Sequence, residues 1–201
     1  MTLTASAYAN TCGNRSFELN INANSPTEIV LHNRSSRDLG AFLKTKALLG
    51  YVTQGLTVAK YQSGYSVEYS SQKLSDGSWC SRVSRLNVDF GLSDAPYIYV
   101  ASELPRGGCL YNEVMKHEYQ HLAISREMVK AGQSQLNIRL KGALSPNGAR
   151  AKSADAATKI IETKIATAIE SVTSRLYKIA EQKNARLDTP SNYAALGNIC
   201  R

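Results

Sequence analysis

The stretch PYIYVASELPRGGCLYNEVMKHEYQH (Pro96–His121) contains a strand pattern followed by a helix pattern. Its first part is rich in β-branched and aromatic side chains, which is typical of a β-strand. A pair of glycines at 107–108 then interrupts the chain. The range Leu110–Lys130 contains neither glycine nor proline, and apolar residues recur through it. The sequence therefore predicts a strand, a break, and a helix that Gly132 ends.

The chain before this stretch reads as strands crossed by one helix. Alternation of apolar and polar residues is clearest in VSRLNVDF, residues 83–90, whose apolar members mostly face one way. A helix is expected at 35–50, where Ser35 and Asp38 are placed like a capping pair. Four segments carry strand patterns: 27–33, 51–62, 64–70 and 81–91.

The chain after the stretch is mainly helical. Residues 133–144 are ambiguous, and 145–153 read as a loop. From 154 to about 186 there is no glycine or proline, and the spacing of apolar residues predicts a long amphipathic helix. Strands first and helices later make this an α+β chain with a small, mostly antiparallel sheet, an H-E-x-x-H helix and a long C-terminal helix.

The motif HEYQH places two of the chain's three histidines on one predicted helix. Because side chains four residues apart project from the same helix face, His117 and His121 can bind one metal ion. Imidazoles with this spacing are typical ligands of catalytic Zn²⁺. Glu118 lies beside the first histidine, where it would accept the proton of a zinc-activated water. We expect a zinc site; the alternative is a surface helix with two incidental histidines.

A third zinc ligand is needed, because catalytic zinc takes three protein ligands and keeps a fourth position for water. On the long C-terminal helix, Glu162 lies at the margin of the apolar stripe, and we expect it to be this ligand. Its alternative role is a boundary glutamate paired with a lysine. Asp188, in RLDTPSNY, is the second candidate, although an aspartate before Thr-Pro can instead cap a turn.

Other polar residues receive lesser roles. His32 belongs to an early strand, and Glu127 points away from the helix face that carries the two histidines, so neither is expected to bind the metal. Tyr193, Tyr111 and Arg106 are candidate hydrogen-bond donors to an oxyanion, and one sequence does not select among them.

The four cysteines are widely spaced, and none of them forms a C-x-x-C motif. An even number of such cysteines is typical of proteins in an oxidising compartment. Three pairings are open. We favour Cys80 with Cys109, joining the strand region to the segment before the metal helix, and Cys12 with Cys200, tying the chain ends. The alternative is four buried free thiols.

The length of 201 residues suits one domain, which we assign to residues 10–201. Residues 1–9 are interpreted as a signal-peptide remnant, because Ala7–Ala9 has the A-x-A form of a signal-peptidase site; the alternative is a flexible terminus. No apolar run approaches the roughly 20 residues that cross a bilayer. The net charge of +8 is spread along the chain without the aromatic interleaving of a nucleic-acid surface. We therefore expect a secreted or periplasmic protein with no membrane span and no nucleic-acid partner; its oligomeric state is open.

The motif HEYQH on a helix, preceded by the strand PYIYVASEL, resembles the zincin metallopeptidases. In that clan the strand before the active helix pairs with an extended substrate. The wider order, with WC, H-E-x-x-H, a long helix and LDTPSNY before a last cysteine, is similar to uncharacterised secreted bacterial proteins regarded as zinc-dependent proteases. The resemblance implies that His117 and His121 are ligands and Glu118 the general base. The metzincin extension is absent, because Ile124 and Glu127 occupy its positions.

These observations favour a zinc peptidase that cleaves secreted or cell-envelope protein, or the peptides of the cell wall. Two alternatives remain. The first is a non-catalytic module that keeps the zincin fold and holds an extended partner by strand addition. The second is a metalloenzyme that hydrolyses a non-peptide amide or ester by the same zinc–water chemistry.

Overall fold

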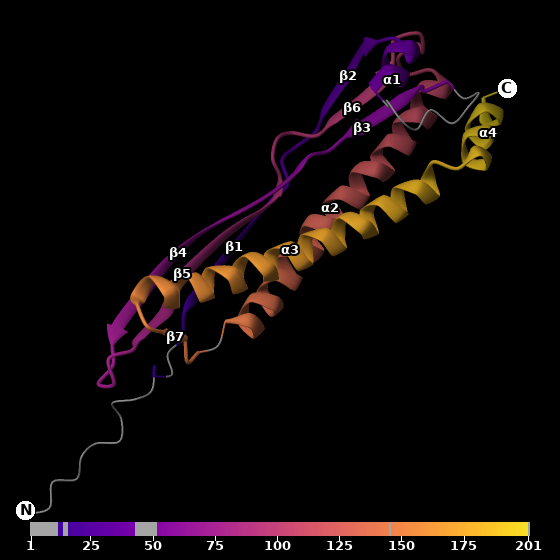
Figure 1. Cartoon of the computed structure of the whole chain (residues 1–201). Helices are drawn as coiled ribbons and strands as arrows, with labels where there is room; N and C mark the ends of the chain where they lie inside the picture. The colour runs from indigo at the N-terminus through magenta and orange to yellow at the C-terminus, as the bar shows by residue number, and fades with distance from the viewer. Residues whose placement is uncertain (1–11, 14–15, 43–51, 145, 201) are drawn as a thin grey trace, which may run out of the picture. The chain divides into compact units, whose positions relative to one another are not determined.

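The computed structural model describes residues 12–13, 16–42, 52–144 and 146–200. The first nine residues, interpreted above as a signal-peptide remnant, lie outside these ranges, as does the second half of the helix expected at 35–50. Four helices and seven strands occur in the described residues (Figure 1). In chain order they are β1 (Glu18–Asn24), β2 (Ile29–Arg34), α1 (Ser36–Phe42), β3 (Gly55–Val58), β4 (Tyr61–Lys73), β5 (Trp79–Leu92), β6 (Tyr97–Ala101), α2 (Cys109–Ala143), β7 (Ala149–Ala151), α3 (Ala154–Leu187) and α4 (Pro190–Ile199).

The described strands form two sheets rather than the single, mostly antiparallel sheet that the sequence predicted. One sheet has the order β1-β5-β4, and β7 pairs antiparallel with β5. The other has the order β2-β6-β3 and is mixed, because β6 runs parallel to β2 and antiparallel to β3. Strand periodicity shows which residues share a face but not which strands pair, so the division into two sheets was not visible in the sequence. The α+β class is confirmed.

The chain divides into two compact units. Among the described residues, the first unit comprises those up to Ala23, Ser63–Phe90 and Gly132–Arg175. The second comprises Asn24–Gln62, Gly91–Ala131 and residues from Leu176 onward. Strands β4 and β5 and helices α2 and α3 contribute residues to both units.

The core of the first unit confirms the predicted alternation in β5. Leu86 and Val88 are fully buried and Phe90 nearly so, whereas Arg85 and Asp89, which alternate with them along the strand, are exposed. Buried apolar side chains of α2 and α3 complete this core: Leu136, Leu140, Ile161, Ile165, Ile169 and Val172. The apolar stripe predicted for the long C-terminal helix is therefore the buried face of α3.

Helix α2 does not end at Gly132, as the sequence predicted, but continues to Ala143. A Cβ atom at position 132 would collide with the ring of Phe90. This glycine therefore permits close packing between helix and strand inside the first unit, rather than a helix stop. The ambiguous residues 133–144 belong to this extension of the helix, up to residue 143.

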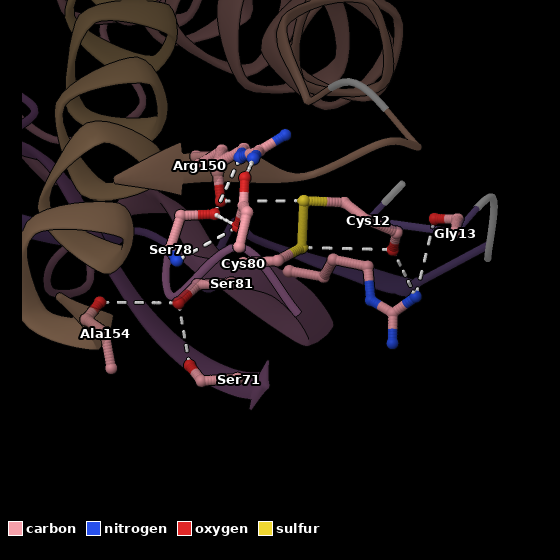
Figure 2. Close-up of a disulfide and its surroundings, with 11 residues drawn as sticks. Cys12, Gly13, Ser71, Ser78, Cys80, Ser81, Arg150 and Ala154 are labelled. Carbon is pink, nitrogen blue, oxygen red and sulfur yellow. Dashed lines mark hydrogen bonds and ion pairs between the residues drawn. A yellow bond between two sulfur atoms is a disulfide. The ribbon is translucent and has the colours of Figure 1, made fainter. Parts of the chain in front are cut away.

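The two disulfides are Cys12–Cys80 and Cys109–Cys200, so the pairing favoured from sequence was wrong. Each bond lies within one unit. The first joins the N-terminal segment to β5 (Figure 2). Arg82 Nη1, also on β5, donates to the Cys12 carbonyl oxygen over 2.7 Å. The second joins the start of α2 to the end of α4, a helix that the sequence did not predict. Without α4, the proximity of Cys200 to Cys109 could not be foreseen.

None of the helices in the described ranges has an apolar window sufficient to cross a membrane.

Candidate metal centre

The two histidines of the motif lie in the N-terminal part of α2, in the second unit. Their spacing of four residues brings the imidazole rings to a centroid distance of 4.8 Å in an edge-to-face arrangement. Both residues are largely removed from solvent, with side-chain exposures of 8% for His117 and 13% for His121. The Nε2 atoms of the two rings are 3.2 Å apart. The predicted helix and the predicted convergence of the histidines are therefore present.

Asp188 meets these histidines from the junction between α3 and α4. Thr189 caps α4, because its side chain accepts a hydrogen bond from the backbone N–H of Asn192, and Pro190 follows in the first turn. The side-chain Nδ2 of Asn192 in turn donates to the carbonyl oxygens of Arg186 and Leu187 at the end of α3. The sequence RLDTPSNY thus folds into a tight helix–helix junction, and this junction fixes Asp188.

Three potential ligand atoms converge on one point. Asp188 Oδ1 lies 3.2 Å from His117 Nε2 and 3.1 Å from His121 Nε2, and the two nitrogens are separated by a similar distance. In a tetrahedral zinc site with bonds of about 2.0–2.1 Å, ligand atoms are separated by about 3.3 Å. The three atoms therefore have the spacing of three corners of such a site. In the described part of the chain these residues form one possible metal-binding group.

Asn184 on α3 fixes the orientation of the second histidine. His121 Nδ1 lies 2.9 Å from the Asn184 side-chain oxygen, so the Nδ1–H donates and Nε2 faces Asp188. A lone pair on Nε2 would then point at a carboxylate oxygen, and the two repel unless a proton or a metal cation lies between them. Such an outer hydrogen bond is the usual support of a metal-binding histidine.

The charges of these groups depend on one another. Burial disfavours the charged imidazolium, but hydrogen bonds with Asp188 and Asn184 outweigh burial and raise the pKa of His121 to about 8. Burial would likewise raise the pKa of the Asp188 carboxyl, but hydrogen bonds with His117 and His121 lower it below its usual range. His121 therefore keeps its proton near neutral pH when no metal is bound, and a metal ion must displace that proton.

Glu118 is buried next to this group and is held by β3. The Thr57 hydroxyl lies 2.9 Å from both Glu118 Oε2 and the Glu118 carbonyl oxygen. Burial raises the pKa of Glu118, although His121 and Thr57 partly oppose this rise. A Cβ atom at Gly55 would lie 2.5 Å from Glu118 Oε1 and 2.6 Å from Val114 Cγ1, so β3 approaches α2 closely because residue 55 has no side chain. No local pattern in the sequence predicts this contact.

The structure does not group Glu162 with the two histidines, contrary to our expectation. The Glu162 carboxylate lies 3.5 Å from Lys159 Nζ, in the lysine-paired role that was the alternative, and it belongs to the first unit. Among the described residues the third member of the metal-binding group is Asp188, the second candidate. A helical wheel gives the direction of a side chain around the axis but not its level along the axis, and about seven turns of chain separate Glu162 from Asp188.

Two further residues considered in the sequence analysis, His32 and Glu127, have partners of their own. His32 Nε2 lies 2.8 Å from the Leu104 carbonyl oxygen. The His32 ring also contacts Tyr111 and Arg106, so His32, Tyr111 and Arg106 form a separate cluster. Glu127 pairs with Lys183 on the exposed surface.

Of the three candidate oxyanion donors, Tyr193 is the one in contact with the metal-binding group. Its hydroxyl donates to Asp188 Oδ1 over 2.8 Å, and its ring centroid lies 5.5 Å from that of His117. Burial and the Asp188 charge raise the pKa of Tyr193, so the hydroxyl keeps its proton and remains a donor.

Strand β6 is not the strand beside the site, although the zincin resemblance implied that it would be. Both of its edges are paired, with β2 on one side and β3 on the other. The strand that contacts Glu118 is β3, at the end of the described strand order. Which strand lies beside Glu118 depends on how the strands pair, and the local pattern of PYIYVAS does not indicate its pairing partners.

Comparison with known proteins adds no relative. No family model, no curated protein and no solved structure matches the chain. Any assignment of function therefore depends on the geometry of the group itself.

Proposed function

We propose that this chain is a zinc-dependent peptidase of the zincin type, with His117, His121 and Asp188 as zinc ligands and Glu118 as general base. One observation carries the proposal: three ligand atoms 3.1–3.2 Å apart, with a buried carboxylate one residue from the first ligand. Two neutral imidazoles and a carboxylate oxygen are a donor set that catalytic zinc accepts, and the fourth position is left for water.

Zinc bound to this donor set would lower the pKa of a water molecule and polarise a substrate carbonyl. The chain's own residues supply the remaining functions. Glu118 accepts the proton of the attacking water and later delivers it to the leaving amine. Burial favours this role, because a raised pKa brings a carboxylate closer to the working pH. Thr57 holds the carboxylate in place, and Asn184 holds the imidazole of His121.

The proposed substrate is a peptide in extended form, and the proposed compartment is the periplasm or the exterior. Strand β3 is an edge of its sheet in the described residues and contacts Glu118, so a peptide could pair with its backbone beside the carboxylate. Two disulfides support an oxidising compartment, because such bonds are reduced in most cytosols. Secreted proteins, envelope proteins and the peptides of the cell wall are the proposed substrates.

The test compares metal content and hydrolysis in wild type, His117→Ala and Glu118→Gln. Mass spectrometry is expected to find about one zinc per chain in wild type and Glu118→Gln, and almost none in His117→Ala. Against a mixed peptide library, Glu118→Gln is expected to be about 10²- to 10⁴-fold slower than wild type, because it keeps the metal and loses the base.

Three results would contradict the proposal in different ways. If wild type takes up no zinc, the donor set is not a zinc site. Bound zinc without cleavage of any peptide would favour the non-catalytic binding module. Cleavage confined to small esters or non-peptide amides would favour the alternative hydrolase.

A further inference from the structure

Helix α4 lies on the surface of the second unit and packs by one side. None of its ten residues is buried, and the two that are partly buried, Tyr193 and Leu196, are three residues apart on one helix face. Cys200 follows Leu196 by four residues and forms the disulfide with Cys109. A helix of ten residues is marginal in water by itself. The position of α4 therefore depends on this face, on the junction at Thr189 and on the disulfide at its far end.

The same helix forms one wall of the surroundings of His117. A hollow of about 180 Å³ is lined by His117, Glu118 and three residues of α4. A second hollow, of about 320 Å³, is lined by His117 and four residues of α4, and Leu196 belongs to both. The Tyr193 hydroxyl also donates to Asp188 Oδ1 over 2.8 Å. Displacement of α4 would therefore open both hollows and remove a hydrogen bond from the metal-binding group.

The two disulfides differ in their access to solvent. Cys12 and Cys80 are both buried, and Cys80 is fully so. Cys109, in contrast, is exposed, and Cys200 is only partly buried. A disulfide is reduced when a thiolate reaches one of its sulfur atoms, so exposed bonds react more readily than buried ones. The bond that holds α4 is therefore the one that an external thiol can reach in the folded protein.

We propose that the Cys109–Cys200 bond is a reversible redox switch, which a dithiol opens to release α4 and uncover His117. One thiolate of the dithiol attacks a sulfur atom of the bond, which breaks and leaves a mixed disulfide. The second thiol of the dithiol then attacks this mixed disulfide and forms the reagent's own disulfide. The protein gains two electrons and two protons, and the dithiol loses them. Oxidation of Cys109 and Cys200 restores the bond and returns α4 to its place.

The switch would act on the metal-binding group through α4. In the oxidised chain, Tyr193 holds Asp188 Oδ1 within 3.1–3.2 Å of both histidine nitrogens. In the reduced chain, α4 leaves this position and Asp188 loses that donor. The oxidised form is thus the active form of the proposed peptidase. This consequence rests on the proposed function, whereas the release of α4 does not.

The test uses the full chain without metal, treated with increasing dithiothreitol under native conditions. Alkylation followed by peptide mass spectrometry measures each disulfide, and Cys109–Cys200 is expected to be reduced at least about 10-fold faster than Cys12–Cys80. Hydrogen–deuterium exchange then measures α4, whose amides should exchange at least about 10-fold faster after this reduction. Amides of residues 122–129 in α2 should stay protected, which shows that the second unit remains folded. Removal of the dithiol and reoxidation should restore protection in α4.

A pair of serine variants separates release of α4 from other effects of the reagent. Cys109→Ser/Cys200→Ser should show the fast exchange of α4 without any dithiol, and Cys12→Ser/Cys80→Ser should exchange there as wild type does. Diethyl pyrocarbonate, which modifies accessible imidazoles, provides a second measurement. It should label His117 at least about 3-fold faster in the first variant than in wild type. His32, which lies in a separate cluster, is the internal reference.

Each outcome supports or overturns the switch. Equal rates of reduction for the two disulfides would overturn it, because the bond at α4 would have no special access. Selective reduction that leaves α4 protected and His117 unlabelled would also overturn it, since the junction and Tyr193 would then hold the helix unaided. If α4 is released but the wild-type chain binds no zinc, the switch stands and the proposed function fails.

Discussion

At the scale of single residues, the site shows what helical periodicity can and cannot predict. The spacing of His117 and His121 was sufficient to predict their convergence, because neighbours on one helix face are set by local geometry alone. Asp188 could be named only as a candidate, since its position depends on the junction made by Thr189 and Asn192. Asn184 was missed, because an asparagine on a helix gives no signal until its partner is known.

Removing Asp188 should cost far more zinc affinity than removing Glu162. Loss of an outer hydrogen bond to a metal ligand costs about 10- to 100-fold, so we expect Asn184→Ala to fall in this range and Asp188→Ala to exceed about 100-fold. Competition with a chelator measures these affinities. Glu162→Ala is the control and should bind zinc as wild type does, because its carboxylate contacts Lys159 and not the histidines. Equal losses in Asp188→Ala and Glu162→Ala would contradict the ligand assignment.

At the scale of elements, segments with a clear apolar pattern were predicted well, including the short strands β2 and β6, whereas β1 and α4 were not predicted. Helix α3 runs from Ala154 to Leu187, close to the predicted range, because many apolar positions define its period. Strand β1 was not among the predicted strands, since asparagines occupy its exposed face. Helix α4 has no buried residue, so no apolar stripe marked it. Such elements are fixed by contacts across the chain, which one sequence does not display.

The close approach of β3 to α2 predicts that a side chain at Gly55 lowers the stability of the protein. Gly55→Ala would place a methyl group against Glu118 and Val114, and overpacking of this kind destabilises by about 1–3 kcal/mol. Gly64→Ala in β4 is the matched control, because a Cβ there meets no atom within 4 Å and replacing a strand glycine is otherwise slightly favourable. Urea unfolding measures both changes. If Gly55→Ala proves as stable as Gly64→Ala, strand and helix are not in the contact described.

At the scale of the whole molecule, each unit contains one disulfide, and the metal-binding group belongs to the second unit. Cys109–Cys200 joins the start of the metal helix to the end of α4, which carries Tyr193. Cys12–Cys80 lies in the first unit, which contains none of the three proposed ligands. The two bonds should therefore affect different properties.

Replacing both cysteines of each pair by serine separates stability from metal binding. The chain-entropy model predicts that loss of either disulfide lowers the free energy of unfolding by a similar amount, about 4–5 kcal/mol. Zinc affinity should fall in Cys109→Ser/Cys200→Ser, because α4 loses its tether, and stay unchanged in Cys12→Ser/Cys80→Ser. Competition with a chelator measures the zinc affinity of both variants, at a temperature where both remain folded. A loss of affinity in the Cys12 and Cys80 variant alone would contradict this division.

The separation between His121 and Asp188 also sets a time at which the site can first exist. Asp188 follows His121 by 67 residues, and ribosomes add about 5–20 residues per second. For roughly 3–13 s during synthesis, the growing chain therefore holds both histidines without their carboxylate partner. A chain interrupted in this interval has only two of the three ligands, so the proposed hydrolysis cannot begin on the ribosome until the junction that fixes Asp188 has been made.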